Sequence, residues 1–384
     1  MRRSVRFSVL VLFITLLLVG LGLLVACGSS TPAATTNYNG SASVGDLVTI
    51  TIDRTAHTLT YQNLTNNQSG TSIYTVNADG SYGSFSDPNL VRAREIPNYA
   101  VFLQVKNAGS NAQTQALVTA PVQATLTNST FNSQNFNFIQ FRTAGGGTHA
   151  GWISVDSSGN LSGNAYRPWQ NLDYTLSLNG VITPFKSVVA DGAINLATAA
   201  VSANGYLTAP QGPKNNYVFG TQNGLFLVDS PKGTSLGLPK ASSAAFNASF
   251  AGTYSLMYFS KAVTAIVLDS TGAETGTPTM DVGSISFDAS GNATLKDSGG
   301  NTVWQGLLQP FSTAANIPAG LGDPCNGLFT ARVTSGGKQK DLFVGFLAGQ
   351  NGAPNVTLVS FFSSASPIAT DQSYSYMYGV GVAQ

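Results

Sequence analysis

The feature that most constrains the fold is a series of short segments in which apolar and polar residues alternate. Residues 48–53, Val-Thr-Ile-Thr-Ile-Asp, alternate strictly, and residues 59–61 resume the pattern after a short break. A period of two places every second side chain on the same face of an extended strand. No window shows a convincing 3.6-residue apolar stripe, so we expect few and short helices.

Similar runs recur along the chain and are often separated by clusters of Gly, Asn, Asp or Ser. They cover residues 73–76, 100–105, 136–141, 174–178, 217–219, 225–228, 265–268, 342–347 and 356–362. Turn residues between half-buried strands are typical of antiparallel meanders. The sequence therefore predicts an all-β protein built from antiparallel sandwich or barrel units.

An internal repeat divides the C-terminal two-thirds of the chain. Residues 151–160 and 283–292 are identical at seven of ten positions, and both read as a strand entering a tight turn. Residues 136–141 resemble residues 254–259, and residues 204–209 resemble residues 326–331. Three matches in the same order indicate a duplicated β unit.

These patterns give a domain plan in five parts. We expect a signal peptide at 1–26, a flexible tether at 27–43, an N-terminal β unit at 44–124, and two related β units at 125–250 and 251–384. The tether is predicted because residues 28–43 are mostly Ser, Thr, Ala, Asn and Gly with no apolar periodicity.

Charge is scarce in this chain. Charged residues make up 9% of the sequence, against about 25% in a typical soluble domain. Removing Arg2, Arg3 and Arg6 of the N-terminal region from the 18 basic residues leaves 15 against 17 acidic ones. The composition thus lacks the basic footprint of a nucleic-acid-binding protein.

The N-terminus consists of three arginines, an apolar run over residues 9–26, and Leu24-Val25-Ala26-Cys27-Gly28. This arrangement resembles the signal peptide and lipobox of bacterial lipoproteins. The resemblance implies Sec-type export, cleavage before Cys27 and a diacylglycerol on the Cys27 thiol, so that membrane lipid is the first expected partner. The alternative is an uncleaved anchor helix, because the apolar run just reaches spanning length.

Sorting follows from the same resemblance. In diderm bacteria, Gly28 after the cysteine is similar to the pattern of lipoproteins sent to the outer membrane. The expected location is therefore the cell envelope, with the folded part periplasmic or exposed at the surface.

Motifs that suggest catalysis lack their usual context. Residues 233–237 fit Gly-x-Ser-x-Gly around Ser235, but no helix pattern follows, and His57 and His149 both precede the serine. Residues 335–338 have Ser-x-x-Lys spacing around two glycines, which favours a hairpin loop. No catalytic residue is predicted.

Metal and cofactor sites are likewise not predicted. Cys325 is interpreted as an ordinary small residue near a turn. Two separate histidines do not make a transition-metal site. The Asp-x-Ser-Gly-Asn turns at 156–160 and 288–292 lack the acidic spacing of an EF-type loop, so backbone turn chemistry is the better interpretation.

Two aromatic segments remain. Residues 166–169, Tyr-Arg-Pro-Trp, could contact a sugar or a peptide, although core packing is the simpler interpretation. Residues 374–380, Tyr-Ser-Tyr-Met-Tyr-Gly-Val, alternate at period two and predict an aromatic core row on one face of the last sheet.

The functional expectation follows from these points. It is a membrane-anchored binding or structural module outside the cytoplasm, with an envelope protein or a glycan as candidate partner. The alternative is an extracytoplasmic hydrolase of esters or glycans, using Ser235 or acidic residues brought together by the fold.

Overall fold

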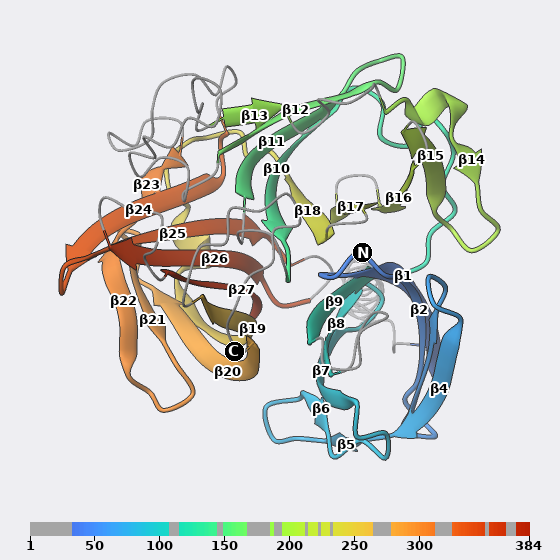
Figure 1. The fold of residues 1–384 in the computed structure, drawn as a ribbon, viewed down its shortest axis with the longest axis horizontal. Helices are drawn as coiled ribbons and strands as arrows, with labels where there is room; N and C mark the ends of the chain where they lie inside the picture. Colours follow the sequence, from blue (N-terminus) through green and yellow to red (C-terminus); the bar gives the residue numbers. More distant parts are fainter. Residues whose placement is uncertain are drawn as a thin grey trace, which may run out of the picture.

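The computed structural model describes residues 33–106, 115–143, 149–166, 185–187, 194–211, 214–221, 224–230, 233–263, 278–311, 325–349, 353–365 and 374–384. These residues form three antiparallel sheets of nine strands each. Figure 1 shows the three sheets curled around a common centre, the first in blue at the lower right, the second in green across the top, and the third in orange and red at the left. We call them the first, second and third units.

The first unit contains β1 Thr35–Ala42, β2 Leu47–Asp53, β3 Thr58–Asn63, β4 Gln68–Ile73, β5 Thr75–Val76, β6 Tyr82–Gly83, β7 Leu90–Ile96, β8 Ala100–Val105 and β9 Ala116–Pro121. The second contains β10 Gln134–Phe141, β11 His149–Val155, β12 Leu161–Tyr166, β13 Phe185–Ser187, β14 Ala200–Val201, β15 Leu207–Gln211, β16 Lys214–Gly220, β17 Phe226–Ser230 and β18 Gly233–Pro239. The third contains β19 Gly252–Val263, β20 Pro278–Phe287, β21 Asn292–Lys296, β22 Thr302–Leu307, β23 Gln309–Pro310, β24 Leu328–Ser335, β25 Lys338–Leu347, β26 Val356–Ala365 and β27 Tyr374–Ala383. Two 3-10 turns, η2 Leu196–Thr198 and η3 Ala248–Phe250, are the helical elements of the described residues.

All three sheets share one strand order. The order in the first unit is β4-β3-β2-β1-β9-β8-β7-β6-β5, and the other two units repeat it strand for strand. The first and last strands of each unit pair in the middle of the sheet, so each unit is a barrel-like meander whose open seam lies between its fourth and fifth strands. The all-β, antiparallel prediction with repeated units is confirmed, and the topology extends the repeat to the first unit.

The matching segments of the sequence repeat occupy equivalent places. Asp156 follows β11, and its Oδ1 accepts hydrogen bonds from the backbone N–H of Ser158 (2.8 Å) and Asn160 (2.9 Å). Asp288 follows β20 and accepts the same two bonds, from Ser290 (2.8 Å) and Asn292 (2.9 Å). These carboxylates therefore close hairpin turns. Among the described residues, no group of three or more His, Cys, Asp or Glu could hold a metal ion.

The predicted tether is wrong over most of its described length. Residues 35–42 form β1, which pairs with β2 and, near its end, with β9. Apolar periodicity is weak there because Tyr38 and Ala42 point into the first unit, whereas Asn39 and Ser41 make polar contacts with the second unit. Position 40 requires glycine because β1 lies close to β9 there: a Cβ on residue 40 would lie 2.0 Å from the carbonyl oxygen of Thr119.

The core has four parts. Each unit has its own interior cluster, with Tyr38 in the first, Phe136 in the second and Tyr254 in the third. The fourth cluster, which we call the central cluster, lies between the units and includes Phe102 and Phe259, which face away from their own barrels. A strand buried on both faces carries apolar residues at consecutive positions, as β8 does over residues 100–103.

Within the described residues, no helix is long and apolar enough to span a bilayer. The signal region and Cys27 lie outside the described residues.

Candidate functional site

The serine of the Gly-x-Ser-x-Gly motif lies in the middle of a strand. Ser235 is part of β18 and is buried. A nucleophile elbow needs a sharp turn from a strand into a helix, which this position does not provide.

The sheet nevertheless brings Ser235 and His149 near each other. Both residues pair with Gln140 of β10, one from each side. Two strand spacings separate their backbones by roughly 10 Å. His149 Nδ1 lies 2.5 Å from Gln140 Oε1, so this ring nitrogen is directed at the amide between them and not at the serine. The arrangement does not form a serine–histidine pair.

The other motifs have structural roles where they are described. Ser335 and Lys338 pair across a hairpin in which Gly336 (φ 60°) and Gly337 (φ 71°) form the turn, as predicted. Cys325 is a buried thiol in the central cluster.

The predicted aromatic core row is confirmed. Tyr374, Tyr376, Tyr378 and Val380 of β27 all belong to the central cluster. Residues 167–169 of the other aromatic segment lie outside the described residues.

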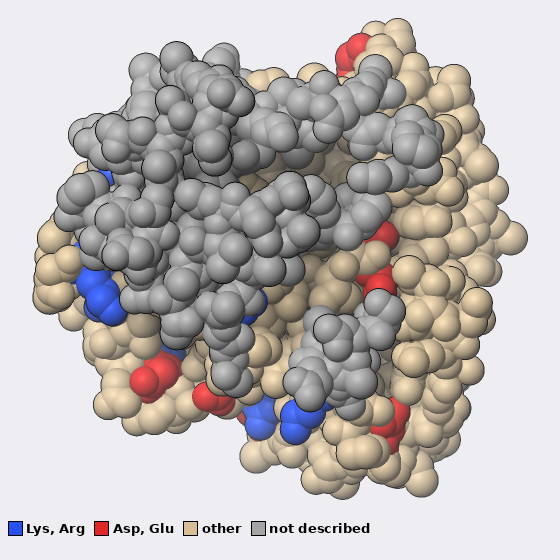
Figure 2. Space-filling model, viewed as in Figure 1, with Lys and Arg blue, Asp and Glu red and all other residues tan. Residues whose placement is uncertain are grey.

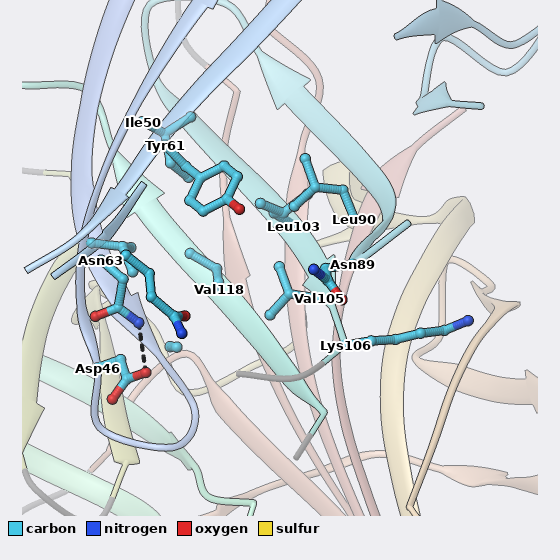
Figure 3. Close-up of a pocket in the computed structure, with 13 residues that line it drawn as sticks. Asp46, Ile50, Tyr61, Asn63, Asn89, Leu90, Leu103, Val105, Lys106 and Val118 are labelled. Atoms are coloured by element: carbon cyan, nitrogen blue, oxygen red, sulfur yellow. Dashed lines mark hydrogen bonds between the residues drawn. The ribbon is translucent and has the colours of Figure 1, made fainter. Parts of the chain in front are cut away.

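A cavity opens at one end of the first unit, where β2, β4 and β7 begin and β3 and β8 end (Figure 3). We call it the mouth cavity, and its volume is about 70 Å³. It is lined by Ala42, Asp46, Val48, Ile50, Tyr61, Asn63, Gln68, Asn89, Leu90, Leu103, Val105, Lys106 and Val118.

The floor of the mouth cavity is apolar and belongs to the barrel interior. Val48, Ile50, Leu103 and Val118 are all buried and are members of the interior cluster of the first unit. They come from strands that are neighbours or near neighbours in the sheet, and their side chains converge because alternate residues of each strand face inwards.

The rim is polar, and Asp46 is its one acidic residue. Asp46 accepts a hydrogen bond of 2.7 Å from Asn63 Nδ2, drawn as a dashed line in Figure 3. Lys106 extends away from the cavity in the same view. The Tyr61 hydroxyl donates to Asp87 (2.8 Å), and burial, followed by this bond, raises the pKa of Tyr61 to about 12. Tyr61 is therefore a neutral phenol at physiological pH.

The opposite end of the first unit is closed by a polar cluster. The Glu95 carboxylate is contacted by Arg54 Nη2 at 2.5 Å and by Arg54 Nε at 3.1 Å. The hydroxyls of Tyr38 and Tyr82 also donate to Glu95. Burial, together with the adjacent carboxylate, raises the pKa of both phenols well above its usual range.

The aromatic rings of the first unit's interior lie away from the floor of the mouth cavity. Its interior cluster contains the buried rings of Tyr38, Tyr74 and Tyr82, and none of these three lines the cavity. Tyr38 and Tyr82 instead contact Glu95 at the opposite end. The floor is therefore built from aliphatic side chains. Sequence reasoning missed this site because the alternation of residues 48–53 predicts a buried face but not how completely that face is filled.

Comparisons with known proteins give no family. No family model matches the chain, and no curated protein matches it. A mutant of transferrin binding protein B from Haemophilus parasuis is similar at 8% identity and a TM-score of 0.21, over 92% of this chain and 78% of the other.

Two further solved structures give similar values. The isotype 1 transferrin binding protein B from Neisseria meningitidis is similar at 9% identity and a TM-score of 0.21, over 91% and 77% of the two chains. A protein with unknown function of the DUF3598 family from Nostoc punctiforme is similar at 11% identity and a TM-score of 0.20, over 68% and 100%. At these TM-scores the similarities carry no argument about this chain.

Proposed function

We propose that this protein is an exported, lipid-anchored binding module that holds the apolar end of a small amphipathic molecule in the mouth cavity of its first unit. The observation that carries the proposal is an apolar floor under a polar rim at one end of the first unit. Apolar pockets with a few polar groups at the edge are the usual form of small-molecule sites.

The size of the cavity limits what it holds. A dry cavity of about 150 Å³ accepts a benzene ring, so the mouth cavity, at about 70 Å³, takes the tip of an alkyl chain rather than a whole ring. The rest of the ligand lies at the rim or outside it.

The rim chemistry indicates the head group. Asp46 is a carboxylate at the edge of the cavity, and Asn63, Gln68 and Asn89 supply amides. A carboxylate disfavours an anionic head group, whereas amide and carboxylate oxygens accept from hydroxyls. A head group that donates hydrogen bonds and carries no negative charge, such as a hydroxyl, fits this rim.

The binding test uses 1-octanol as an uncharged probe and octanoate as its charged counterpart. We expect the mature protein to bind octanol more tightly than octanoate, measured by calorimetry. Val105→Phe places a ring at the half-buried edge of the mouth and should weaken octanol binding at least tenfold. Leu307→Ala, at an exposed position in the third unit, is the matched control and should leave the affinity for octanol unchanged. If octanol binds Val105→Phe as tightly as it binds the unaltered chain, the mouth cavity is not the binding site.

The anchor is a separate part of the proposal. The lipobox around Cys27 supports lipidation, and Gly28 supports the outer membrane in a diderm host. Cys27→Ala should release the protein from the membrane fraction, and an unchanged distribution would argue for an uncleaved anchor helix instead.

Orientation decides which partners can be reached. If protease added to intact cells digests this protein, its folded part is exposed at the cell surface. That result would favour a partner outside the cell, either a protein or a glycan. Protection until the envelope is opened would favour a periplasmic partner. We also propose the five-part division of the chain into signal peptide, tether and three β units, amended so that residues 35–42 belong to the first β unit.

A further inference from the structure

The three units contact one another in a repeating, head-to-tail manner. The first strand of one unit packs against late strands of the next, β1 against β17 and β18, and β10 against β25 and β26. The ring closes where β19 of the third unit packs against β9 of the first. The three boundaries are therefore equivalent in topology, and differences between them are informative.

Two boundaries share one polar contact, in which an asparagine side chain of one unit donates a hydrogen bond to a backbone carbonyl of the next; we call this contact the polar lock. Asn39 of β1 donates from its amide to the backbone carbonyl of Asn204, and Asn137 of β10 donates to the carbonyl of Asn326 at 2.6 Å. Asn204 and Asn326 occupy equivalent Asn-Gly turns before the sixth strand of their units, where Gly205 and Gly327 have positive φ. Asn39 and Asn137 each follow the inward aromatic of the first strand, Tyr38 or Phe136.

The third boundary replaces both partners of this lock. The equivalent of the asparagine is Ser255, which follows Tyr254 in β19, and its Oγ accepts from Gln384 Nε2 at 2.8 Å. The equivalent turn is Asp79-Gly80, with Gly80 at φ 74°. The Asp79 carbonyl accepts instead from the guanidinium of Arg94, a residue of the same unit.

A cavity of about 110 Å³ opens at this boundary, and we call it the closure cavity. Its polar side is formed by Asp79, Ser81, Arg92, Arg94 and Ser255. Its apolar side is formed by Phe102, Met257, Val282, Val380 and Val382, with the backbone of β19 and β20 between them. In Figure 2, basic atoms gather at the lower edge of the molecule, between the first and third units.

We propose that the closure cavity binds a small carboxylate with a short apolar body. Arg92 and Arg94 supply planar guanidinium groups, which match a carboxylate through paired N–H···O bonds. The apolar side accommodates the body of the ligand, and the ligand carboxylate lies against the two arginines of the polar side. This proposal is independent of the mouth cavity, which presents a carboxylate rather than guanidinium groups.

Asp79 does not exclude an anion from the closure cavity. Its Oδ1 accepts from the Ser81 backbone N–H (3.0 Å) and the Ser81 hydroxyl (2.6 Å), and its Oδ2 accepts from Arg92 Nη1 (3.3 Å). The Asp79 carboxylate is thus bonded to Ser81 in its own turn and to Arg92 of β7. Since two guanidinium groups face one carboxylate, the site keeps a positive balance for the ligand.

The test uses hexanoate, with inorganic phosphate as a second probe that has charge but no apolar body. The readout is the methyl resonance of Met257, assigned with Met257→Leu, because this side chain lines the apolar wall. We expect hexanoate to shift this resonance saturably. Phosphate should bind at least tenfold more weakly, and phosphate binding as tight as that of hexanoate would overturn the proposed ligand class.

Two variants locate the carboxylate. Arg94→Gln should weaken hexanoate binding at least tenfold, whereas Lys338→Gln, an exposed basic position of the third unit, should leave it unchanged. Ser255→Asn copies the residue present at the other two boundaries and fills the closure cavity with an amide, so it should abolish the hexanoate-induced shift while the chain stays folded. Unchanged hexanoate binding in both Arg94→Gln and Ser255→Asn would refute the site. Octanol binding at the mouth should be unaffected by either variant, which separates the two proposals.

Discussion

The hydroxyl of Tyr378 lies 2.8 Å from Oγ of Ser43, a residue 335 positions earlier in the chain. Thr143 completes a triangle, with its Oγ1 2.8 Å from Ser43 and 3.0 Å from Tyr378. Each of the three buried hydroxyls comes from a different unit, so they satisfy one another at the point where the units meet. A buried polar network of this kind specifies one arrangement of the units, because any displacement leaves a polar group without its partner.

Removing one hydroxyl of this triangle should weaken the whole molecule. Tyr378→Phe is expected to lower the free energy of unfolding by about 1–2 kcal/mol, because Ser43 and Thr143 each lose a buried partner. The measurement is urea denaturation of the mature chain. The combined Tyr378→Phe and Ser43→Ala variant should lose less than the sum of the two single changes, and strict additivity would contradict the coupling.

Stability should fall between about pH 4 and pH 7 because of Asp229. Burial raises the pKa of this carboxyl to about 7, against the hydrogen bond from Ser41 and with a further contribution from the Asp46 charge. The unfolded carboxyl has a pKa of about 3.9. The native state therefore keeps a proton that the unfolded chain has released, and the stabilisation present below pH 4 is lost as the pH rises through 7, on the order of 4 kcal/mol.

The measurement is the free energy of unfolding at pH 5 and pH 8. Asp229→Asn should remove the decline between these values, whereas Asp156→Asn at an exposed turn should keep it. A decline that persists unchanged in Asp229→Asn would assign it to another group.

Glu95→Gln should be among the most destabilising polar changes in the first unit. The Glu95 side chain is 1% exposed and that of Arg54 19% exposed, so the change leaves a poorly solvated guanidinium without its carboxylate. We expect a loss of about 3 kcal/mol in urea denaturation. Glu95→Gln combined with Arg54→Met should recover part of it, since the uncompensated charge is then absent. If the double variant is less stable than Glu95→Gln alone, the loss of stability does not come from the uncompensated Arg54 charge.

Gly40→Ala tests whether residues 35–42 are a structural strand. The added methyl would lie 2.0 Å from the Thr119 carbonyl oxygen and 2.4 Å from the Ala120 Cα, so β1 and β9 must separate. We expect a loss of about 2 kcal/mol or more. Thr35→Ala at the exposed start of the strand should stay within about 0.5 kcal/mol of the unaltered chain. If Gly40→Ala leaves the free energy of unfolding unchanged, residues 35–42 are better interpreted as a flexible tether.

The hairpin turns show which features can be predicted from residues that are close together in the sequence. Asp156 and Asp288 were predictable because their side chains bond to backbone groups two and four residues away. The same turn of the first unit escapes notice because His57, and not glycine, holds the positive φ (52°) there. Asp79-Gly80 stands before β6 as Asn204-Gly205 stands before β15, but two residues are too short a match to reveal a third copy.

The sites of the molecule were not predictable in the same way. Nothing in the sequence marks Ser255 or Arg94, and they line the same cavity only because the third unit packs against the first. The mouth cavity depends on the volumes of side chains from many strands, which periodicity does not report.

The sequence by itself determined the all-β class, the antiparallel repeat and the turns, because period-two burial and turn geometry depend on neighbours a few residues apart. The tertiary structure decided that β1 is a strand, that the first unit shares the topology of the others, and that three outward faces form a fourth core. These features rest on contacts between residues that are mostly far apart in the chain, such as Ser43 with Tyr378, and no local pattern encodes which distant surface will cover an apolar or polar face.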